Sequence, residues 1–132
     1  YFMLCSSVSV AASDTLASEI GSLDPRTRII TTLEAVPAGT NGGMSPTGTL
    51  AAFYGALLIS VVSTILGAIN GDRTPVELFF PFVILIGWLG CQIDSILGAM
   101  LENRGHLGKH GVNFIATLSG SLMALLVATR LF

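Results

Sequence analysis

Three long, almost uncharged runs constrain the fold of this chain more than any other feature. Residues 45–71 and 111–129 contain no charged side chain, and residues 76–100 contain only Glu77 and Asp94. A helix that crosses a bilayer needs about 20 predominantly apolar residues, and each run is long enough or nearly so. Residues 1–20 are more polar, and we interpret them as the last part of another span. The sequence therefore predicts an all-α, polytopic transmembrane helix bundle with about four spans in this chain.

The composition agrees with a membrane protein and argues against a soluble one. Hydrophobic residues make up 52% of the chain and charged residues 11%, whereas soluble domains carry about 25% charged residues. We expect an integral membrane protein, in the cell membrane if the source is prokaryotic. We expect residues 1–132 to form a single transmembrane domain, the C-terminal part of a longer membrane protein. A net charge of −2 without a basic run indicates that nucleic acid is not a partner.

The basic residues predict an orientation in the membrane. Four of them fall in the first and third connections and two fall in the second connection and near the C-terminus: Arg26, Arg28, Arg104 and Lys109 against Arg73 and Arg130. Because Lys and Arg are enriched in cytoplasmic loops, the first and third connections are expected to be cytoplasmic.

The unusual polar residues gather on that same side. Asp14 and Glu19 lie at the end of the first span, Asp94 lies near the end of the third, and Asn113 lies at the start of the fourth. The glycine-rich residues 37–48 lead into the second span. The topology thus predicts one polar site at one membrane boundary.

The glycine-rich stretch is a candidate phosphate cradle. Glycine permits backbone conformations that turn successive N–H groups toward one ligand, and a following helix would add its positive N-terminus. The candidate phosphate-binding residues here are Gly39, Thr40, Asn41, Gly42, Gly43 and Ser45. The sequence is not a Walker loop, because no lysine follows the glycines. A plain turn before a membrane helix explains the same spacing, and both readings stay open.

Asp14 and Asp94 are candidates for catalysis and for binding a metal. An ionisable group within a span costs about 2.5–3.5 kcal/mol on insertion scales, and neither residue has a Lys or Arg in its own span. Two carboxylates at one depth suit Mg²⁺, which takes one or two carboxylates together with phosphate oxygens. Arg28 and Lys109 would neutralise phosphate charge, although the orientation rule alone explains basic residues there. There is also a purely structural alternative. In it, the two aspartates bind no metal and accept hydrogen bonds from hydroxyl and amide groups inside the bundle.

Small residues recur at helical spacing within the spans. They are Gly48, Ala52, Gly55, Ser63 and Gly67 in the second, Gly87, Cys91, Ser95 and Gly98 in the third, and Ala116 and Gly120 in the fourth. Such stripes let helix backbones approach closely in a membrane, so we expect them to form the packing faces of the bundle.

Five motifs, in this order, resemble one known family. They are Ser13-Asp-Thr-Leu-Ala-Ser-Glu-Ile-Gly21, Arg28-Ile-Ile-Thr-Thr32, Val36-Pro-Ala-Gly-Thr-Asn-Gly-Gly-Met-Ser-Pro-Thr-Gly-Thr-Leu50, Gly90-Cys-Gln-Ile-Asp-Ser-Ile-Leu-Gly-Ala99 and Val112-Asn-Phe114. The likeness covers nearly the whole chain. It is to the integral membrane family that contains phytyl-phosphate kinase and animal transmembrane protein 19, and archaeal members are especially similar.

The resemblance implies a membrane-embedded, nucleotide-dependent kinase of the CTP type. Such an enzyme converts an isoprenoid monophosphate, such as phytyl or geranylgeranyl phosphate, to the diphosphate, with Mg²⁺ and a nucleoside triphosphate. Matching positions imply catalytic roles for Asp14, Glu19 and Asp94, and binding roles for the glycine loop and Asn113. An isoprenoid lipid and the membrane are the expected partners, and the sequence leaves a homo-oligomer open.

A second function class fits the same residues. In a transporter or lipid-binding bundle, intramembrane carboxylates would form a cation or proton pathway. Such a pathway should reach both sides of the membrane, whereas the polar residues of this chain crowd one side.

Overall fold

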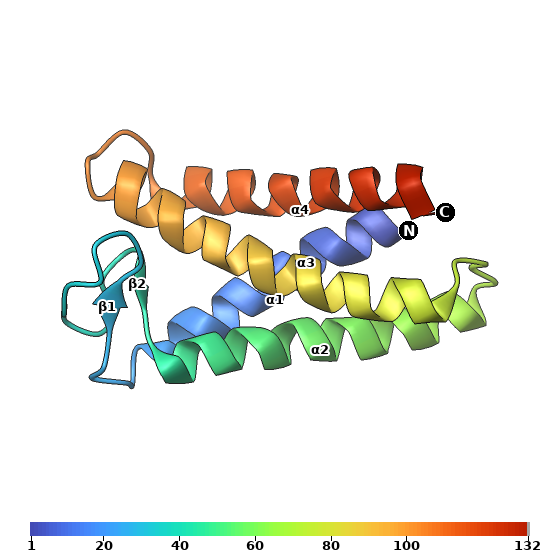
Figure 1. Ribbon diagram of the computed structural model, residues 1–132, viewed down its shortest axis with the longest axis horizontal. Coiled ribbons are helices and arrows are strands. Elements are labelled where there is room, and N and C mark those ends of the chain that lie inside the picture. Colours follow the sequence, from blue (N-terminus) through green and yellow to red (C-terminus); the bar gives the residue numbers. More distant parts are fainter. Residues whose placement is uncertain (132) are drawn as a thin grey trace.

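The computed structural model describes residues 1–131 and shows four long helices in that range (Figure 1). The helices are α1 (Phe2–Gly21), α2 (Pro46–Ile69), α3 (Val76–Leu97) and α4 (Lys109–Leu131), and a π-helical turn, η1 (Gly98–Glu102), extends α3. Successive helices run in opposite directions, so the bundle is up-and-down (Figure 1). The predicted all-α class is therefore confirmed.

Three segments are long and apolar enough to cross a membrane. Among the residues described, these are Pro46–Ile69, Val76–Glu102 and Lys109–Leu131. Helix α1 is as long as a span but more polar, because its sequence includes five serines, Asp14 and Glu19. It lies against all three of the other helices. The fourth expected span is thus a helix, although its composition does not qualify it as a membrane span.

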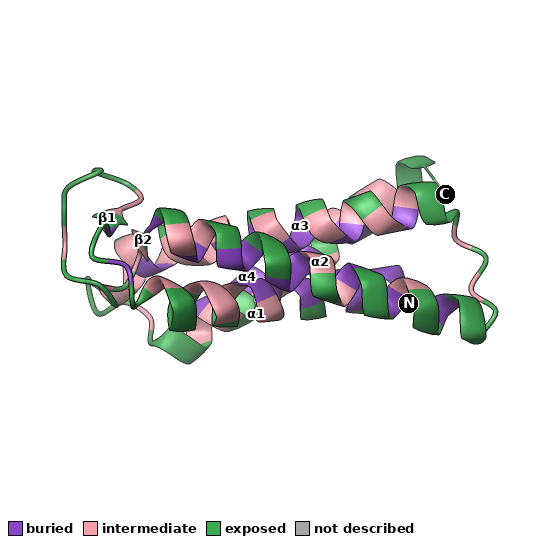
Figure 2. Cartoon of the chain, turned by 90° about the horizontal axis from the view of Figure 1, so that it is seen from below, coloured by how far each residue is buried: buried purple, intermediate pink, exposed green. Residues whose placement is uncertain are grey.

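The small residues form the packing faces, as predicted. Val10 of α1 is fully buried, and a side chain on Gly90 of α3 or Gly120 of α4 would overlap it. On the other side of α1, a Cβ added to Gly55 would lie 3.0 Å from the Cα of Ser13. Buried residues therefore follow the inward faces of the helices, while exposed residues cover much of the outer surface (Figure 2).

Serine hydroxyls tie neighbouring helices together. Ser9 Oγ of α1 donates to the carbonyl of Val83 at 3.0 Å, and Ser60 Oγ of α2 donates to the carbonyl of Phe80 at 2.7 Å. Ser7 Oγ donates to the carbonyl of Thr117 in α4 at 2.9 Å. Interhelical hydrogen bonds in membrane proteins contribute about 0.6–2 kcal/mol each, so these contacts supplement the close packing.

Large apolar side chains cover the outward faces. Leu58 and Ile65 on α2 are 57% and 55% exposed, and Phe114 and Leu126 on α4 are both 66% exposed. A water-soluble monomer rarely exposes so much contiguous apolar surface, whereas a bilayer solvates it. The bundle is therefore built to face lipid.

The polar connections lie at one end of the bundle, as predicted. The connection from α1 to α2 and the connection from η1 to α4 are at one end, and the α2 to α3 connection is at the other (Figure 1). The first connection contains a small antiparallel hairpin of β1 (Arg28–Ile29) and β2 (Gly43–Met44). This hairpin was not predicted from the sequence.

Candidate functional site

A polar cavity of about 290 Å³ opens at the end that carries the two polar connections. All four helices, η1 and the hairpin loop contribute to its wall. It brings together eleven of the predicted site residues: Asp14, Glu19, Gly39, Thr40, Asn41, Gly42, Gly43, Ser45, Asp94, Lys109 and Asn113. Residues from four separate sequence motifs thus meet in one place.

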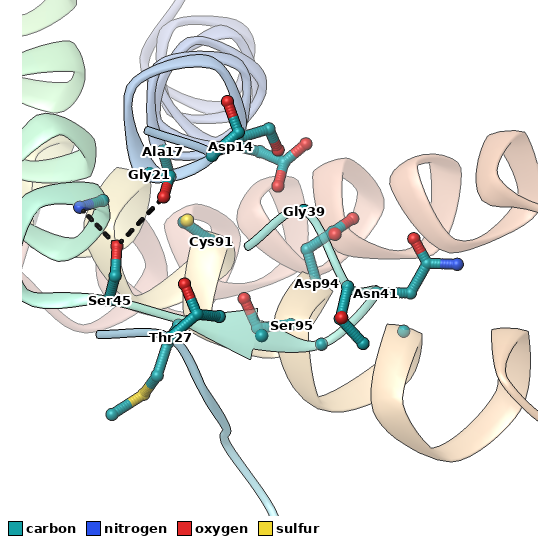
Figure 3. A pocket seen from close by; sticks show the side chains of 18 of the residues that line it. Asp14, Ala17, Gly21, Thr27, Gly39, Asn41, Ser45, Cys91, Asp94 and Ser95 are labelled. Carbon is teal, nitrogen blue, oxygen red and sulfur yellow. Dashed lines mark hydrogen bonds between the residues drawn. The ribbon is translucent and has the colours of Figure 1, made fainter. Parts of the chain in front are cut away.

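Asp14 and Asp94 form a carboxyl pair across the gap between α1 and α3. The two side chains are close enough to share a hydrogen bond, and Lys109 and Glu102 lie near enough to act on both through their charges. Figure 3 shows both carboxyl groups directed into the cavity. Neither forms a salt bridge among the residues described, where Arg26 with Asp24 is the single ion pair. Within residues 1–131 the two carboxyls therefore have each other and Asn113 as neighbours, and no cation within salt-bridge distance.

Asn113 holds Asp94 in place. With its amide turned so that the nitrogen faces two oxygens, Nδ2 donates to Asp94 Oδ2 and to the carbonyl of Lys109, each at 3.1 Å. The bond to the Lys109 carbonyl fixes the amide on the first turn of α4. Asn113 is thus a neighbour of the carboxyl pair, as its place in the sequence motif implied.

The glycine loop is docked on the end of α3. Gly42 adopts φ +73, and a Cβ there would lie 2.5 Å from the Cβ of Ala99. Asn103 Nδ2 donates to the carbonyl of Asn41 at 3.0 Å. Gly39 and Asn41 line the same cavity as Asp94 (Figure 3). Close approach of two backbones is what requires glycine at position 42.

Three backbone amides of the loop make no hydrogen bond within the described chain. Thr40 N–H donates to the carbonyl of Pro37, and Gly43 N–H donates to the carbonyl of Thr40. Within residues 1–131, the N–H groups of Gly39, Asn41 and Gly42 have no hydrogen-bond acceptor. Such unpaired amides in a turn are able to bind an anion.

The N-terminus of α2 differs from the expectation. Ser45 caps the helix and its Oγ accepts from Gly48 N–H at 3.1 Å, while Thr47 N–H donates to Asp24 Oδ2 at 3.3 Å. A carboxylate of the chain itself therefore occupies the positive end of the helix. The helix amides expected to help hold phosphate are already bonded, although Ser45 lines the cavity.

Of the two basic candidates, only Lys109 lines the cavity. Arg28 lies in β1, where its Nη1 donates to the carbonyl of Leu33 at 2.8 Å. Arg28 is not among the residues of the cavity wall. The two residues could not be distinguished from the sequence, because both are basic residues in connections on the same side.

Asp24 is the polar residue that sequence reasoning missed. Its side chain is 3% exposed, and Arg26 contacts it through Nε and Nη2, both at 2.9 Å. The hydrogen bonds from Arg26 and then from Thr47 hold the pKa of this carboxyl well below its usual range. The run Asp-Pro-Arg-Thr is typical of a turn, which was the available signal, but the partner at Thr47 is 23 residues away.

The donor set fits a hard divalent cation. No group of three or more His, Cys, Asp and Glu residues gathers in the part of the chain that is described. Zinc sites need three or four protein ligands, whereas Mg²⁺ binds through one or two carboxylates and keeps waters and phosphate oxygens. Asp14 and Asp94 beside an open polar cavity match the second pattern.

Fold and site together define a class: a polytopic helical membrane protein with a carboxylate-bearing cavity at one end of the bundle. The chain belongs to the integral membrane protein family DUF92, which matches residues 1–121. This confirms the family expected from the sequence motifs.

Relatives come from archaea, cyanobacteria and plants. The chain is 37% identical to an uncharacterised membrane protein of Methanocaldococcus jannaschii, over 92% of this chain and 49% of that protein. It is 36% identical to an uncharacterised membrane protein of Synechocystis, over 90% and 45%. It is 32% identical to Protein VTE6, chloroplastic, of Arabidopsis thaliana, over 92% and 36%. The chain thus spans half or less of these relatives, and no solved structure matches it.

Proposed function

We propose that this chain carries the active site of a membrane-embedded kinase for isoprenoid monophosphates. The observation that supports this most is the carboxyl pair of Asp14 and Asp94 in one cavity with the free amides of the glycine loop. A cation-binding pair beside an anion-binding turn is the arrangement that phosphoryl transfer needs. The resemblance to phytyl-phosphate kinase supports the same chemistry.

The reaction would transfer the terminal phosphoryl group of a nucleoside triphosphate, with CTP favoured. An oxygen of the isoprenoid monophosphate forms a bond to the γ-phosphorus, and the bond from that phosphorus to the β-phosphate oxygen breaks. The products are an isoprenoid diphosphate and a nucleoside diphosphate. Phytyl and geranylgeranyl phosphate are the acceptors we expect.

Each site residue has a role in this scheme. Asp14 and Asp94 would hold Mg²⁺, which when bound neutralises charge on the phosphates. The N–H groups of Gly39, Asn41 and Gly42 donate to phosphate oxygens, and Lys109 balances the remaining negative charge. Asn113 keeps Asp94 oriented toward the cavity, and Glu19 lies on the cavity wall. Catalysis is then positioning and charge stabilisation rather than covalent chemistry.

The location of the cavity suits a substrate with a polar head and an apolar tail. The cavity lies at the end of the bundle that carries the polar connections, while the helix faces beyond it are apolar and exposed. The phosphate head would enter the cavity while the tail stays in the bilayer. By the distribution of basic residues, we place this end on the cytoplasmic side.

The test uses the full-length protein, purified in detergent. Phosphate transfer from CTP, ATP, GTP or UTP to phytyl or geranylgeranyl monophosphate is measured with Mg²⁺ and with EDTA. We expect diphosphate to form, fastest with CTP, and only when Mg²⁺ is present. No product with any nucleotide would reject the kinase and favour a transporter or lipid-binding bundle that uses the same carboxylates.

A further inference from the structure

Both ends of the hairpin loop that carries the glycine turn converge on one buried carboxylate. Asp24 lies between the end of α1 and the start of the hairpin, and it contacts the chain on both sides of that hairpin. We propose that Asp24 is a positioning residue that clamps the two ends of the loop and thereby holds the glycine turn beside Asp14 and Asp94. The structural part of this inference stands without the proposed function. Only the expected effect of Asp24 on enzyme activity rests on it.

The first half of the clamp is on the incoming side, in the residues just before β1. Asp24 Oδ1 accepts from the backbone N–H and from Nε of Arg26, both at 2.9 Å, and Oδ2 accepts from Nη2 at 2.9 Å. Thr27 Oγ1 donates to the Asp24 carbonyl at 2.9 Å. The Asp24 carboxylate is 3% exposed, whereas the Arg26 side chain that covers it is 68% exposed.

The second half of the clamp is on the outgoing side. Thr47 lies in the first turn of α2, just after β2, and its Oγ1 donates to Asp24 Oδ2 at 2.5 Å. Its N–H donates to the same oxygen at 3.3 Å. The negative charge also faces the positive end of α2, so the carboxylate is the anion that this helix end binds.

The clamp reaches the glycine turn through the hairpin. Ile29 pairs with Gly43, and Ile30 N–H donates to the carbonyl of Gly42 at 3.0 Å. Thr27 packs against Gly43, where a Cβ would lie 2.7 Å from its Cγ2. The two sides of the hairpin, which Asp24 joins at their outer ends, therefore determine where the unpaired amides of the turn lie. Because Asp24 already occupies the N-terminus of α2, we expect a ligand phosphate to bind the unpaired amides of the turn instead.

The chain offers a matched control at the opposite end of the bundle. Asp72 Oδ1 accepts from Thr74 N–H at 2.9 Å and from Thr74 Oγ1 at 2.8 Å. This is the same kind of aspartate turn contact, in the connection between α2 and α3. Asp72 is not one of the residues that line the cavity.

The first measurement is amide hydrogen exchange of the full-length protein, which needs no catalytic activity. In Asp24→Asn we expect the hydrogen-bonded amides of Ile30, Thr40 and Gly43 to exchange about tenfold faster, the equivalent of losing one charged hydrogen bond. In Asp72→Asn we expect exchange of the same three amides to stay unchanged. Unchanged exchange in Asp24→Asn would overturn the clamp even if the protein is a kinase.

The second measurement is steady-state kinetics, with rescue by a small anion. We expect Asp24→Ala to raise the KM for the nucleotide about tenfold, and sodium formate to restore it by filling the vacated carboxylate position, whereas sodium chloride at equal ionic strength does not. Equal responses to both salts, or no rise in KM, would contradict the proposal. If the protein has no kinase activity, the exchange experiment still tests the clamp. Failure of the proposed function and failure of the clamp can therefore be told apart.

Discussion

At the scale of single residues, the cavity brings together side chains from distant parts of the chain. Asp94 is held by Asn113 and faces Asp14, while Lys109 and Glu102 act on both carboxyls through their charges. These contacts come from three helices and η1, so no single motif contains the site. The sequence identified each aspartate from its cost within a span, and the structure brings the two together in one cavity.

Asp24 gives the chain a pH dependence that can be assigned to one group. Its native pKa is lowered, so its contribution to stability is full above the unfolded pKa of about 3.9 and is lost as the pH falls toward the native value. We expect the Tm of the wild type to fall more than that of Asp24→Asn between about pH 6 and about pH 3. Parallel Tm curves for the two proteins would show that Asp24 is not paired in the folded state.

Substitutions at two glycines of the loop distinguish the effect of backbone strain from the effect of steric overlap. Gly39 and Gly42 both have positive φ, but a Cβ on Gly39 meets open space, whereas one on Gly42 would overlap Ala99. We expect Gly39→Ala to cost about 1 kcal/mol of loop stability and Gly42→Ala clearly more. The nucleotide KM and the exchange of the hydrogen-bonded amides of Ile30, Thr40 and Gly43 measure the difference. Equal effects would mean that the loop is not docked on α3.

At the scale of elements, the long helices were predictable and the hairpin was not. Uncharged runs of span length indicated α2, α3 and α4 directly, because hydropathy over some 20 residues is a strong signal. Strands of two residues carry no alternation pattern, so β1 and β2 depend on contacts between distant residues. The same limit hid the bond between Asp24 and Thr47, and it concealed that Arg28 lies outside the cavity while Lys109 lines it.

Helix packing around α1 makes a testable prediction of its own. Gly90→Ala places a methyl group against Val10, and overpacking of this kind costs about 1–3 kcal/mol. Leu85→Ala removes a larger group from the same helix, but Leu85 is 46% exposed to the lipid side. We therefore expect thermal unfolding in detergent to show the larger loss for Gly90→Ala. The reverse order would contradict the central position of α1.

At the scale of the whole molecule, the bundle has one polar end that carries the candidate site. The hairpin loop, η1 and the polar cavity share that end, and the connection at residues 70–75 lies at the other (Figure 1). The arrangement separates a polar, ligand-accessible boundary from an otherwise ordinary turn. The distribution of basic residues between the connections predicts that this end faces the cytoplasm.

Orientation can be read by labelling one loop at each end. Leu33→Cys lies in the hairpin loop, where Leu33 is 57% exposed, and Arg73→Cys lies in the opposite connection, while Cys5 and Cys91 are buried. We expect a membrane-impermeant maleimide to label Arg73→Cys in intact cells and Leu33→Cys only in inverted vesicles. The opposite pattern would place the cavity on the outer side.

Loss of turnover on neutralising the carboxyl pair tests the proposed chemistry most directly. Transfer of radiolabelled phosphate from CTP to phytyl monophosphate is compared in the full-length wild type, Asp14→Asn and Asp94→Asn, with Glu77→Gln as a control at the far end of α3. We expect both aspartate variants to stay folded and lose at least about 100-fold in kcat, while the control keeps its activity. Full turnover in Asp14→Asn or Asp94→Asn would contradict the assignment of the carboxyl pair to phosphoryl transfer.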